Sequence, residues 1–418
     1  MSEAATTDVT EVREDLRRWI DTTWDPDRSL LEWRDQLADS GWACPTWPCE
    51  WGGRGLHAKF AEIVADELAS AGVPGPPEGV GTQLAAPTIL EHGSDDLKRR
   101  YLRPTLTGQI TWCQLFSEPG AGSDLAGLTA RAERDGDEWA VTGQKVWNTG
   151  AAHADFGLLL ARTDWDVPKH RGITYFVLPM RQPGVDVRPL RQMNGHASFN
   201  EVFLDSARAP TKDVIGDVDH GWAVAVATLA HERRLVAGRR KSSRRSPSGR
   251  LWREAMAERN AASEPHKWYP QRAGRVDLLI DQAKATTKHR DPVVRQEIAR
   301  VLSLAWSARW TAQRAAAARA LGRPPGPEGS LGKLATSNIA KAAAQAHSLI
   351  AGAGGMLTGP DGALGGVIAE IFVSVPAQSI AGGTDEIQRN IIGERSLGLP
   401  KEPEPARTLP FRQVPKNT

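Results

Sequence analysis

The chain has 418 residues, 40% of them hydrophobic and 24% charged, with a formal net charge of +2. This length and composition predict a globular protein with about two to three domain-sized cores. The small net charge excludes a nucleic-acid binder that works by bulk electrostatics. The three cysteines favour the reducing cytoplasm and indicate neither a disulfide framework nor a metal site. No apolar run reaches the roughly 18–20 residues of a membrane span, and the polar N-terminus is no secretory signal.

Residues 1–109 are predicted to form an all-helical domain. Apolar residues at three- and four-residue spacing predict a helix over 8–21, where Asp8 and Glu11 offer a capping box. Further helices are predicted over 28–39, 57–71, 82–91 and 94–102.

From 110 to 215 short alternating strands with Gly, Pro and Asp turns predict a β-barrel or sandwich domain. Within it, an apolar run over 110–116 opens into small residues at 120–123, and two strands follow around the turn Asp135-Gly136-Asp137. Small residues let a ligand approach the backbone closely, with amides free to donate. By itself this pattern fits a ligand loop on a β-scaffold or a plain turn.

Helical periodicity returns after the β domain. Helices are predicted over 220–238, 274–287, 292–320, 329–352 and 384–394, and their lengths favour a helical bundle over 216–418. The predicted fold class is therefore α+β, with an N-terminal helical domain, a middle β domain and a C-terminal helical bundle.

Four segments, in this order, resemble the acyl-CoA dehydrogenase family. They are SEPGAGSD (117–124), GQKVWNT (143–149), RGITYFVLPMRQPGVDVRPLRQM (171–193) and AGGTDEIQRNIIGERSLGLP (381–400). The resemblance covers nearly the whole chain. It implies an FAD-dependent enzyme of lipid metabolism that removes an α proton and a β hydride from an acyl-CoA thioester. It also implies a homo- or hetero-oligomer that passes electrons to an electron-transfer flavoprotein.

The resemblance also implies which residues bind the cofactor and the substrate. Backbone at Phe116 and Ser117 would meet the flavin pyrimidine edge, the Thr149 hydroxyl would approach flavin N5, and Trp147 would cover the ring. The other residues that match cofactor-binding or substrate-binding positions are Gly122 and Ser123 beside flavin and pantetheine, Arg233 and Gly382 at the substrate, and Gly352, Gly355, Thr384 and Glu386 at the adenine half of an adjacent subunit's flavin. Gln114 replaces a more usual aromatic residue, and Leu349 replaces a more usual glutamine. Trp147 also fits a core position, and Ser117 and Thr149 also fit ordinary strand hydroxyls.

The catalytic carboxylate is the informative departure. Many family members carry it directly before Gly-Thr in the last domain, where this chain has Gly382. A minority carries it in a Leu-x-x-Glu-Arg pattern on the first long helix of that domain, and Glu232 stands in such a pattern here. Apolar neighbours would raise the pKa of a glutamate toward the range suited to proton abstraction. The alternatives are a surface ion pair for Glu232, and His231 as the base.

Residues 239–272 form a second departure. Seven Arg or Lys residues crowd the part from 239 to 253, and the Arg-x-x-Phe-Gly segment that reaches the flavin pyrophosphate of a neighbouring subunit in most of the family is absent. A basic stretch of this kind fits the phosphates of coenzyme A, an acidic partner surface, or a solvated mobile loop. We expect the mobile loop. The two missing groups keep a non-catalytic partner subunit open as an alternative, and a flavin oxidase or hydroxylase is the other alternative.

Overall fold

The computed structural model describes residues 8–235, 248–321, 323 and 326–415. They divide into two compact units. The first unit runs up to Leu190, from Ser198 to Ser263 and from Ala406 onward, and the second comprises Arg191–Ala197 and Glu264–Pro405. The predicted helical and β domains thus share the first unit, and the boundaries after 109 and after 215 stay predictions.

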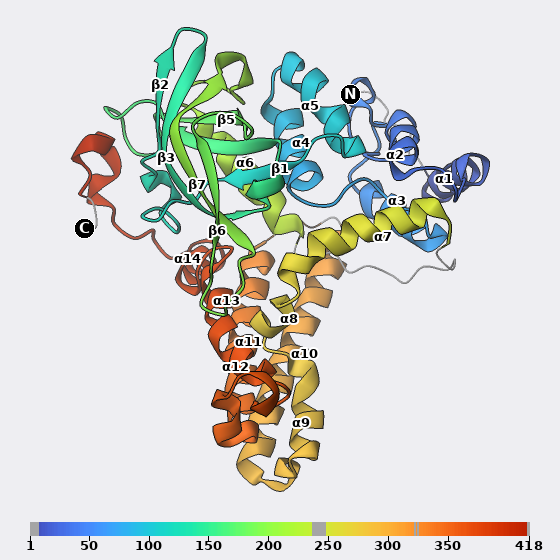
Figure 1. Ribbon diagram of the computed structural model, residues 1–418, viewed down its shortest axis with the longest axis vertical. Coiled ribbons are helices and arrows are strands. Elements are labelled where there is room, and N and C mark those ends of the chain that lie inside the picture. Colours follow the sequence, from blue (N-terminus) through green and yellow to red (C-terminus); the bar gives the residue numbers. More distant parts are fainter. Residues whose placement is uncertain (1–7, 236–247, 322, 324–325, 416–418) are drawn as a thin grey trace. The chain divides into compact units, whose positions relative to one another are not determined.

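The N-terminal part of the first unit is helical, as predicted. Its helices are α1 Val9–Thr23, α2 Leu30–Asp39, α3 Phe60–Ala71, α4 Ala86–His92 and α5 Asp95–Thr107, with a π-helical turn at Gly81–Ala85 before α4 (Figure 1). Leu16, Trp33 and Phe60 are almost completely buried where α1, α2 and α3 pack together. The predicted apolar spacing of these helices therefore corresponds to their buried faces.

The predicted capping box at α1 is wrong. Asp8 is the N-cap residue, but its side chain makes no capping hydrogen bond. The box lies instead at α2, where the Ser29 side chain accepts from the Glu32 N–H and the Glu32 carboxylate accepts from the Ser29 N–H. A capping box satisfies two backbone donors that a helix start leaves unpaired.

The expectation of a mobile loop is also wrong for the described part of 239–272. Residues 239–247 lie outside the described residues, but Arg250–Ser263 form helix α7. Leu251 is fully buried in the core of the N-terminal helices, and Arg34 of α2 donates twice to the Glu258 carboxylate at 2.7 Å. Glu254 accepts from the Leu30 N–H at 2.8 Å, so α7 satisfies a free donor in the first turn of α2.

The β part of the first unit is one curled seven-stranded sheet. Its strands are β1 Trp112–Leu115, β2 Arg131–Asp135, β3 Glu138–Thr149, β4 Phe156–Arg162, β5 Ile173–Pro179, β6 Val185–Leu190 and β7 Phe199–Pro210. They follow the order β1-β4-β2-β3-β7-β6, with β5 paired to β4, and β1 runs parallel to β4. The long antiparallel pair β3 and β7 dominates the view in Figure 1. The predicted turn at Gly136 joins β2 to β3.

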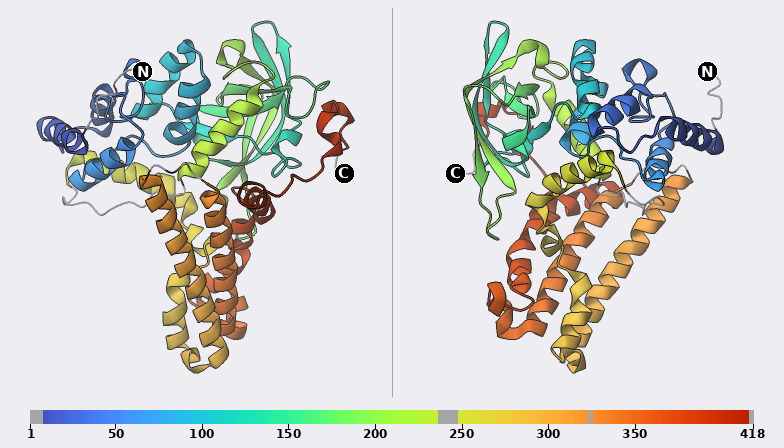
Figure 2. Two further views of the ribbon diagram at one scale, coloured as in Figure 1. Left: turned by 180° about the vertical axis from the view of Figure 1, so that it is seen from behind. Right: turned by 45° about the vertical axis from the view of Figure 1, so that its right-hand side comes forward.

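Strands β4 and β5 are buried on both faces, which explains their continuous apolar sequences. Leu158 and Tyr175 face one core together with residues of α4, α5 and helix α6 (Gly221–Leu235), whereas Leu159 and Phe176 face the other core inside the curled sheet. Helix α6 begins very close to β5, because a Cβ on Gly221 would lie only 2.6 Å from the Tyr175 nitrogen. Figure 2 shows α6 against the sheet, beside the N-terminal helices.

The second unit is a helical bundle, as predicted for the last domain. Its helices are α8 Tyr269–Arg272, α9 Leu279–Ala285, α10 Pro292–Ala320, α11 Glu328–Ala351, α12 Val367–Ser374, α13 Pro376–Ile380 and α14 Asp385–Ser396 (Figure 2). The loop Arg191–Ala197 belongs to this unit, since His196 stacks on Trp268 and bonds Glu370 at 2.9 Å. The α, β, α order predicted from the sequence is confirmed.

Among the residues that the structure describes, one stretch, Val367–Ser396, is long and apolar enough by composition to cross a membrane, with 22% of its most apolar window buried. The prediction that no apolar run reaches the length of a membrane span does not hold for this stretch. In the structure the stretch is divided into α12, α13 and α14, and the left-handed Gly382 and Gly383 lie between the last two helices.

Candidate functional site

The small-residue segment after β1 forms a tight turn with an open outer face. The N–H of Glu118 donates to the Ala121 carbonyl at 3.0 Å, and the N–H of Ala121 donates back at 3.1 Å. A Cβ added at Gly120 or Gly122 would meet nothing within 4 Å, and Ser123 is exposed. The turn therefore presents bare backbone to its surroundings, as a ligand loop requires.

The end of β3 is distorted at the second motif. The register with β7 shifts between Lys145 and Asn148, which leaves one extra residue on β3, a β-bulge. Trp147 at this bulge has φ of 63° and is 54% exposed, with an edge contact to Phe199. A bulky residue with positive φ is an outlier that costs about 1–3 kcal/mol and is typical of functional sites. Thr149 follows it and is half-buried.

Asn148, between these two residues, joins the motif strands. Its Nδ2 donates to the Gln114 carbonyl at 2.7 Å, while its buried Oδ1 has no partner among the described residues. A buried acceptor without a donor is costly, so it indicates a water or ligand donor at this point.

A buried ion pair lies behind both motifs. Lys145 is fully buried, and its Nζ lies 2.8 Å from Glu118 Oε1 and 3.1 Å from the Phe116 carbonyl oxygen, to which it donates. Glu118 also accepts from the Thr129 N–H and hydroxyl and from the Ala130 N–H, at 2.7–2.9 Å. Burial alone would raise the pKa of Glu118, but Lys145 and these donors outweigh it, so the pKa lies below its ordinary value. The pair fixes the turn to β3.

A second buried cation, Arg162, holds the far end of the same segment. Its guanidinium donates to the carbonyls of Ala126 at 2.7 Å and Leu128 at 3.2 Å, and Phe411 from the C-terminal segment covers it at 3.5 Å. Burial lowers the pKa of Arg162 to about 10. Residues 118–128 are thus fixed at both ends by buried positive charge.

Helix α6 carries the predicted base. Glu232 is half-buried, and Thr228, one turn earlier, accepts or donates in a buried hydroxyl cluster with Thr88 at 2.8 Å and Tyr175 at 3.2 Å. The Tyr175 ring packs edge-on against Phe116 at 5.6 Å, which links α6 to the first motif. His231 lies 3.3 Å from the Glu91 carboxylate of α4, an arrangement that favours a structural role for this histidine. The described side chains of α6 end at Glu232, so the Arg233 side chain lies outside them.

The remaining predicted residues lie in the second unit. Gly352 (φ 57°) and Gly355 belong to the turn after α11, and Gly382 (φ 69°) belongs to the turn before α14. Thr384 is the N-cap of α14 and accepts from the Ile387 N–H, while Glu386 is exposed and pairs with Arg389.

Asp385, for which no functional role was predicted from the sequence, is the buried carboxylate of this turn. Its side chain pairs with Lys341 at 2.8 Å, and Lys333 is 3.9 Å away. Burial would raise the pKa of Asp385, but the hydrogen bond from Lys341 and its neighbours lower it below the ordinary value.

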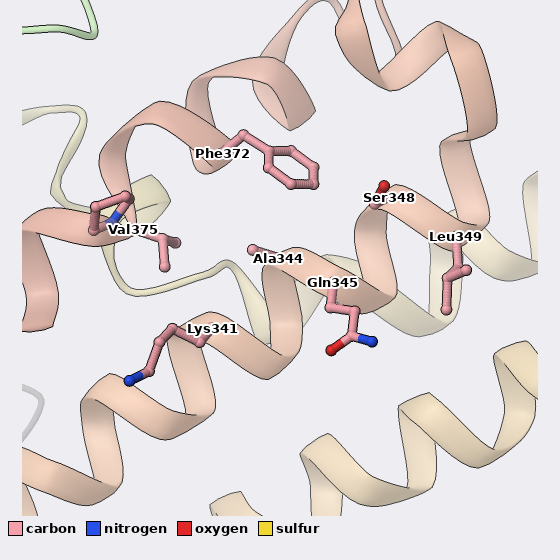
Figure 3. A pocket seen from close by; sticks show the side chains of 8 residues that line it. Lys341, Ala344, Gln345, Ser348, Leu349, Phe372 and Val375 are labelled. Atoms are coloured by element: carbon pink, nitrogen blue, oxygen red, sulfur yellow. The ribbon is translucent and has the colours of Figure 1, made fainter.

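A shallow, mostly apolar groove of about 320 Å³ runs along α11 in the second unit. It is lined by Lys341, Ala344, Gln345, Ser348, Leu349, Phe372, Val375 and Pro376. Figure 3 shows Phe372 of α12 above Ala344 and Ser348 of α11, with Lys341 at one end of the groove.

Sequence reasoning missed the charges that hold the loop. Glu118 and Lys145 belong to the two motifs, but the resemblance assigned only cofactor and substrate contacts to motif residues and no internal ion pair. A signal was present for Arg162, because a lone arginine at the end of the apolar run of β4 predicts a buried cation that needs several acceptors.

Comparison with known proteins gives consistent results. Models of the N-terminal, middle and C-terminal domains of acyl-CoA dehydrogenase match residues 5–109, 113–207 and 273–397. The acyl-CoA dehydrogenase IpdE1 of Mycobacterium tuberculosis is 35% identical over 376 residues, 88% of each chain. Acyl-CoA dehydrogenase FadE34 of the same organism is 37% identical over 365 residues, but this chain spans only 46% of that relative's length. The solved Tcur3481-Tcur3483 steroid ACAD has a TM-score of 0.64 at 26% identity, covering 96% of this chain and 99% of that chain.

Proposed function

Because this chain belongs to the acyl-CoA dehydrogenase family, a flavin-dependent family, we propose that it catalyses FAD-dependent α,β-dehydrogenation of an acyl-CoA thioester. Electrons would pass to a separate electron-transfer flavoprotein. The observation that carries the proposal is the pairing of the open turn at 118–123 with the bulge at 145–149 through the buried pair Glu118–Lys145. Bound FAD would supply hydride acceptance.

Residues of the first unit fit a planar, hydrogen-bonding cofactor. The outer faces of Gly120 and Gly122 are open, and Trp147 exposes half of its indole at a strained position. The N–H of Ser117 has no acceptor among the described residues. Phe116, Ser117, Gly122, Ser123, Trp147 and Thr149 would hold the isoalloxazine. Gly352, Gly355, Thr384 and Glu386 would hold the adenine half of a second subunit's cofactor.

Glu232 would act as the general base, with Arg233 and Ser123 at the substrate. Gly382 supports this assignment, because a glycine cannot take a proton and its left-handed backbone disfavours any other residue. Its N–H would remain available to donate to the thioester oxygen, which acidifies the α proton. Proton abstraction by a positioned carboxylate contributes about 10²–10⁴-fold to the rate.

The relatives suggest a substrate and an assembly to test first. A named structural relative is a steroid ACAD, so a CoA thioester of a bulky, ring-containing acid is the preferred first substrate. The functional unit would be a mixed oligomer in the cytoplasm. A second chain would supply the missing flavin-pyrophosphate arginine. One similar relative is about twice as long as this chain, which is enough length for two chains of this size.

The test is anaerobic bleaching of bound flavin. The chain, alone and with its partner subunit, would be mixed with short linear, long linear, branched and ring-containing acyl-CoA thioesters. Bleaching by at least one thioester supports the dehydrogenase. Bound flavin that no thioester bleaches refutes it and favours the non-catalytic subunit, the second candidate suggested by Gly382. Rapid peroxide formation in air would identify an oxidase.

A further inference from the structure

The Phe116–Ser117 peptide group has two differently occupied sides. Its carbonyl oxygen accepts from Lys145 Nζ at 3.1 Å, inside the protein. The peptide bond is trans, so its N–H points away from its C=O. That N–H, on Ser117, has no acceptor among the described residues, and Ser117 is half-buried. The ammonium therefore lies behind the peptide group and the free donor lies in front of it.

An ammonium bound to a carbonyl strengthens the N–H donor of the same peptide group. Hydrogen bonds in series polarise one another, and a charged donor does so more strongly than a neutral one. Lys145 is fully buried, so little water screens its charge. The next peptide group along the chain is also held in place, because the Ser117 carbonyl accepts from the Val146 N–H at 2.9 Å.

Stability alone does not account for this lysine. Glu118 accepts from Thr129 twice and from Ala130 once, so most of its acceptor capacity is filled without Lys145. Placing an ammonium in a dry interior is costly, and replacing both members of a buried ion pair by apolar residues of similar shape often serves stability as well or better. The buried ammonium is hydrogen-bonded to the same peptide group whose N–H, on Ser117, would face the proposed cofactor. This position points to an electrostatic role for Lys145.

We propose that Lys145 is a positioning residue that polarises the Phe116–Ser117 peptide group and thereby raises the reduction potential of the bound flavin. The inference rests on the proposed placement of the flavin at this loop. A stronger Ser117 N–H stabilises the negative charge that the ring system gains on two-electron reduction. Glu118 orients the ammonium, holding it on the Phe116 carbonyl.

The experiment measures the two-electron reduction potential of the purified holoprotein in Lys145→Met, Lys145→Gln and Lys145→Arg. Methionine keeps the shape without the charge, glutamine keeps a neutral donor, and arginine keeps the charge. We expect Lys145→Met to lower the equilibrium constant for reduction about tenfold, which is about 30 mV for a two-electron couple. Lys145→Gln should fall in between, and Lys145→Arg should lie near the wild type.

The matched control is Asp213→Asn. Asp213 is a buried partner of Arg100 and Tyr101 in the same unit, and within the described residues its side-chain bonds go to these two residues and to neither motif. Its loss should destabilise the unit without shifting the potential. Equal potentials in all three Lys145 variants would overturn the inference, and so would loss of flavin from all three while Asp213→Asn keeps it. Wild-type protein whose flavin no acyl-CoA bleaches would refute the proposed reaction, yet the potential series would still decide the role of Lys145.

Discussion

Two glycine-rich loops, one in each unit, are each held by an ion pair between a buried carboxylate and a lysine. They differ in how far water reaches the lysine. In the loop 118–124 the buried Glu118 is bound by Lys145, which is completely inaccessible to water. In the loop 381–386 the buried Asp385 is bound by Lys341, whose side chain is 47% exposed. The first loop is fixed from inside a sheet, and the second is fixed at the surface of a bundle. An ion pair loses most of its strength to water, so the two lysines are not equivalent.

The loops also differ in the chemistry left to them. The first carries the SEPGAGSD segment, whose resemblance to the family implies contacts with flavin and pantetheine. The second has Gly382 where many family members carry the catalytic carboxylate. The family fold is thus retained in both loops, while the proton-transfer group has moved, in our proposal, to α6 of the first unit.

The largest expected effect is that of Glu232→Gln, which tests whether the chemistry lies in the first unit. Glutamine keeps the shape but cannot accept the α proton, so anaerobic flavin bleaching should slow by about 10²–10⁴-fold. Flavin content and acyl-CoA binding should be unchanged. His231→Gln is the control, because His231 pairs with Glu91 and should alter the rate far less. Bleaching at the wild-type rate in Glu232→Gln would assign the base to another group.

The reverse change, Gly382→Glu in the Glu232→Gln background, should restore little activity. Gly382 has φ of 69°, where a side chain costs about 1–2 kcal/mol. A Cβ there would lie 3.9 Å from Lys333 Cε, so the new carboxylate would pair with that lysine. Recovery to within a factor of ten of the wild type would show that the loop 381–386 can still hold the catalytic base.

The next effect compares the two lysines directly by chemical denaturation. Lys145→Met should lower the free energy of unfolding by about 3 kcal/mol, since it leaves the buried Glu118 without its counter-charge. Lys341→Met should cost at most about 1 kcal/mol, because its ion pair is half in water. Equal losses in the two variants would contradict the difference that we draw between a dry and a wet pair.

Much of the fold and part of the site were predictable for definite reasons. Period-3.6 and period-2 apolar patterns follow from burial, so the α, β, α order was visible in the sequence. The exposed residues of the loop could be recognised by resemblance, because they follow a motif. The buried ion pair behind the loop could not be recognised in this way, since Lys145 meets Glu118 only after β3 folds back beside the turn. Helix α7 was missed because its polar sequence hides a few specific contacts, such as the burial of Leu251.

The role of α7 gives a smaller effect, on stability rather than on flavin. Leu251→Ala should lower the free energy of unfolding by about 2 kcal/mol, because it opens a cavity in the core of the N-terminal helices. Leu251→Met conserves volume and is the control, with an expected loss below about 1.5 kcal/mol. Flavin content should not change in either variant. Replacing 241–262 with a Gly/Ser linker should destabilise the protein, whereas an unchanged melting temperature would show that α7 is dispensable.

The smallest effect is the change in the pH dependence of the unfolding free energy, which Glu118→Gln tests. The pKa of Glu118 lies below its ordinary value of 4.5 in the folded chain, so the carboxylate stabilises the fold fully above that value. This contribution is lost as the pH falls from about 4.5 through the lower folded pKa. Glu118→Gln should therefore be less stable than the wild type at pH 7, and its unfolding free energy should fall less steeply below pH about 4.5. Denaturant unfolding from pH 7 to pH 3 measures both slopes. The pKa of Asp385 is lowered in the same direction, so Asp385→Asn should flatten the same window in the wetter loop. Parallel curves for Glu118→Gln and the wild type would show that the dry pair contributes nothing to acid sensitivity, and the contrast between the loops would then rest on their lysines alone.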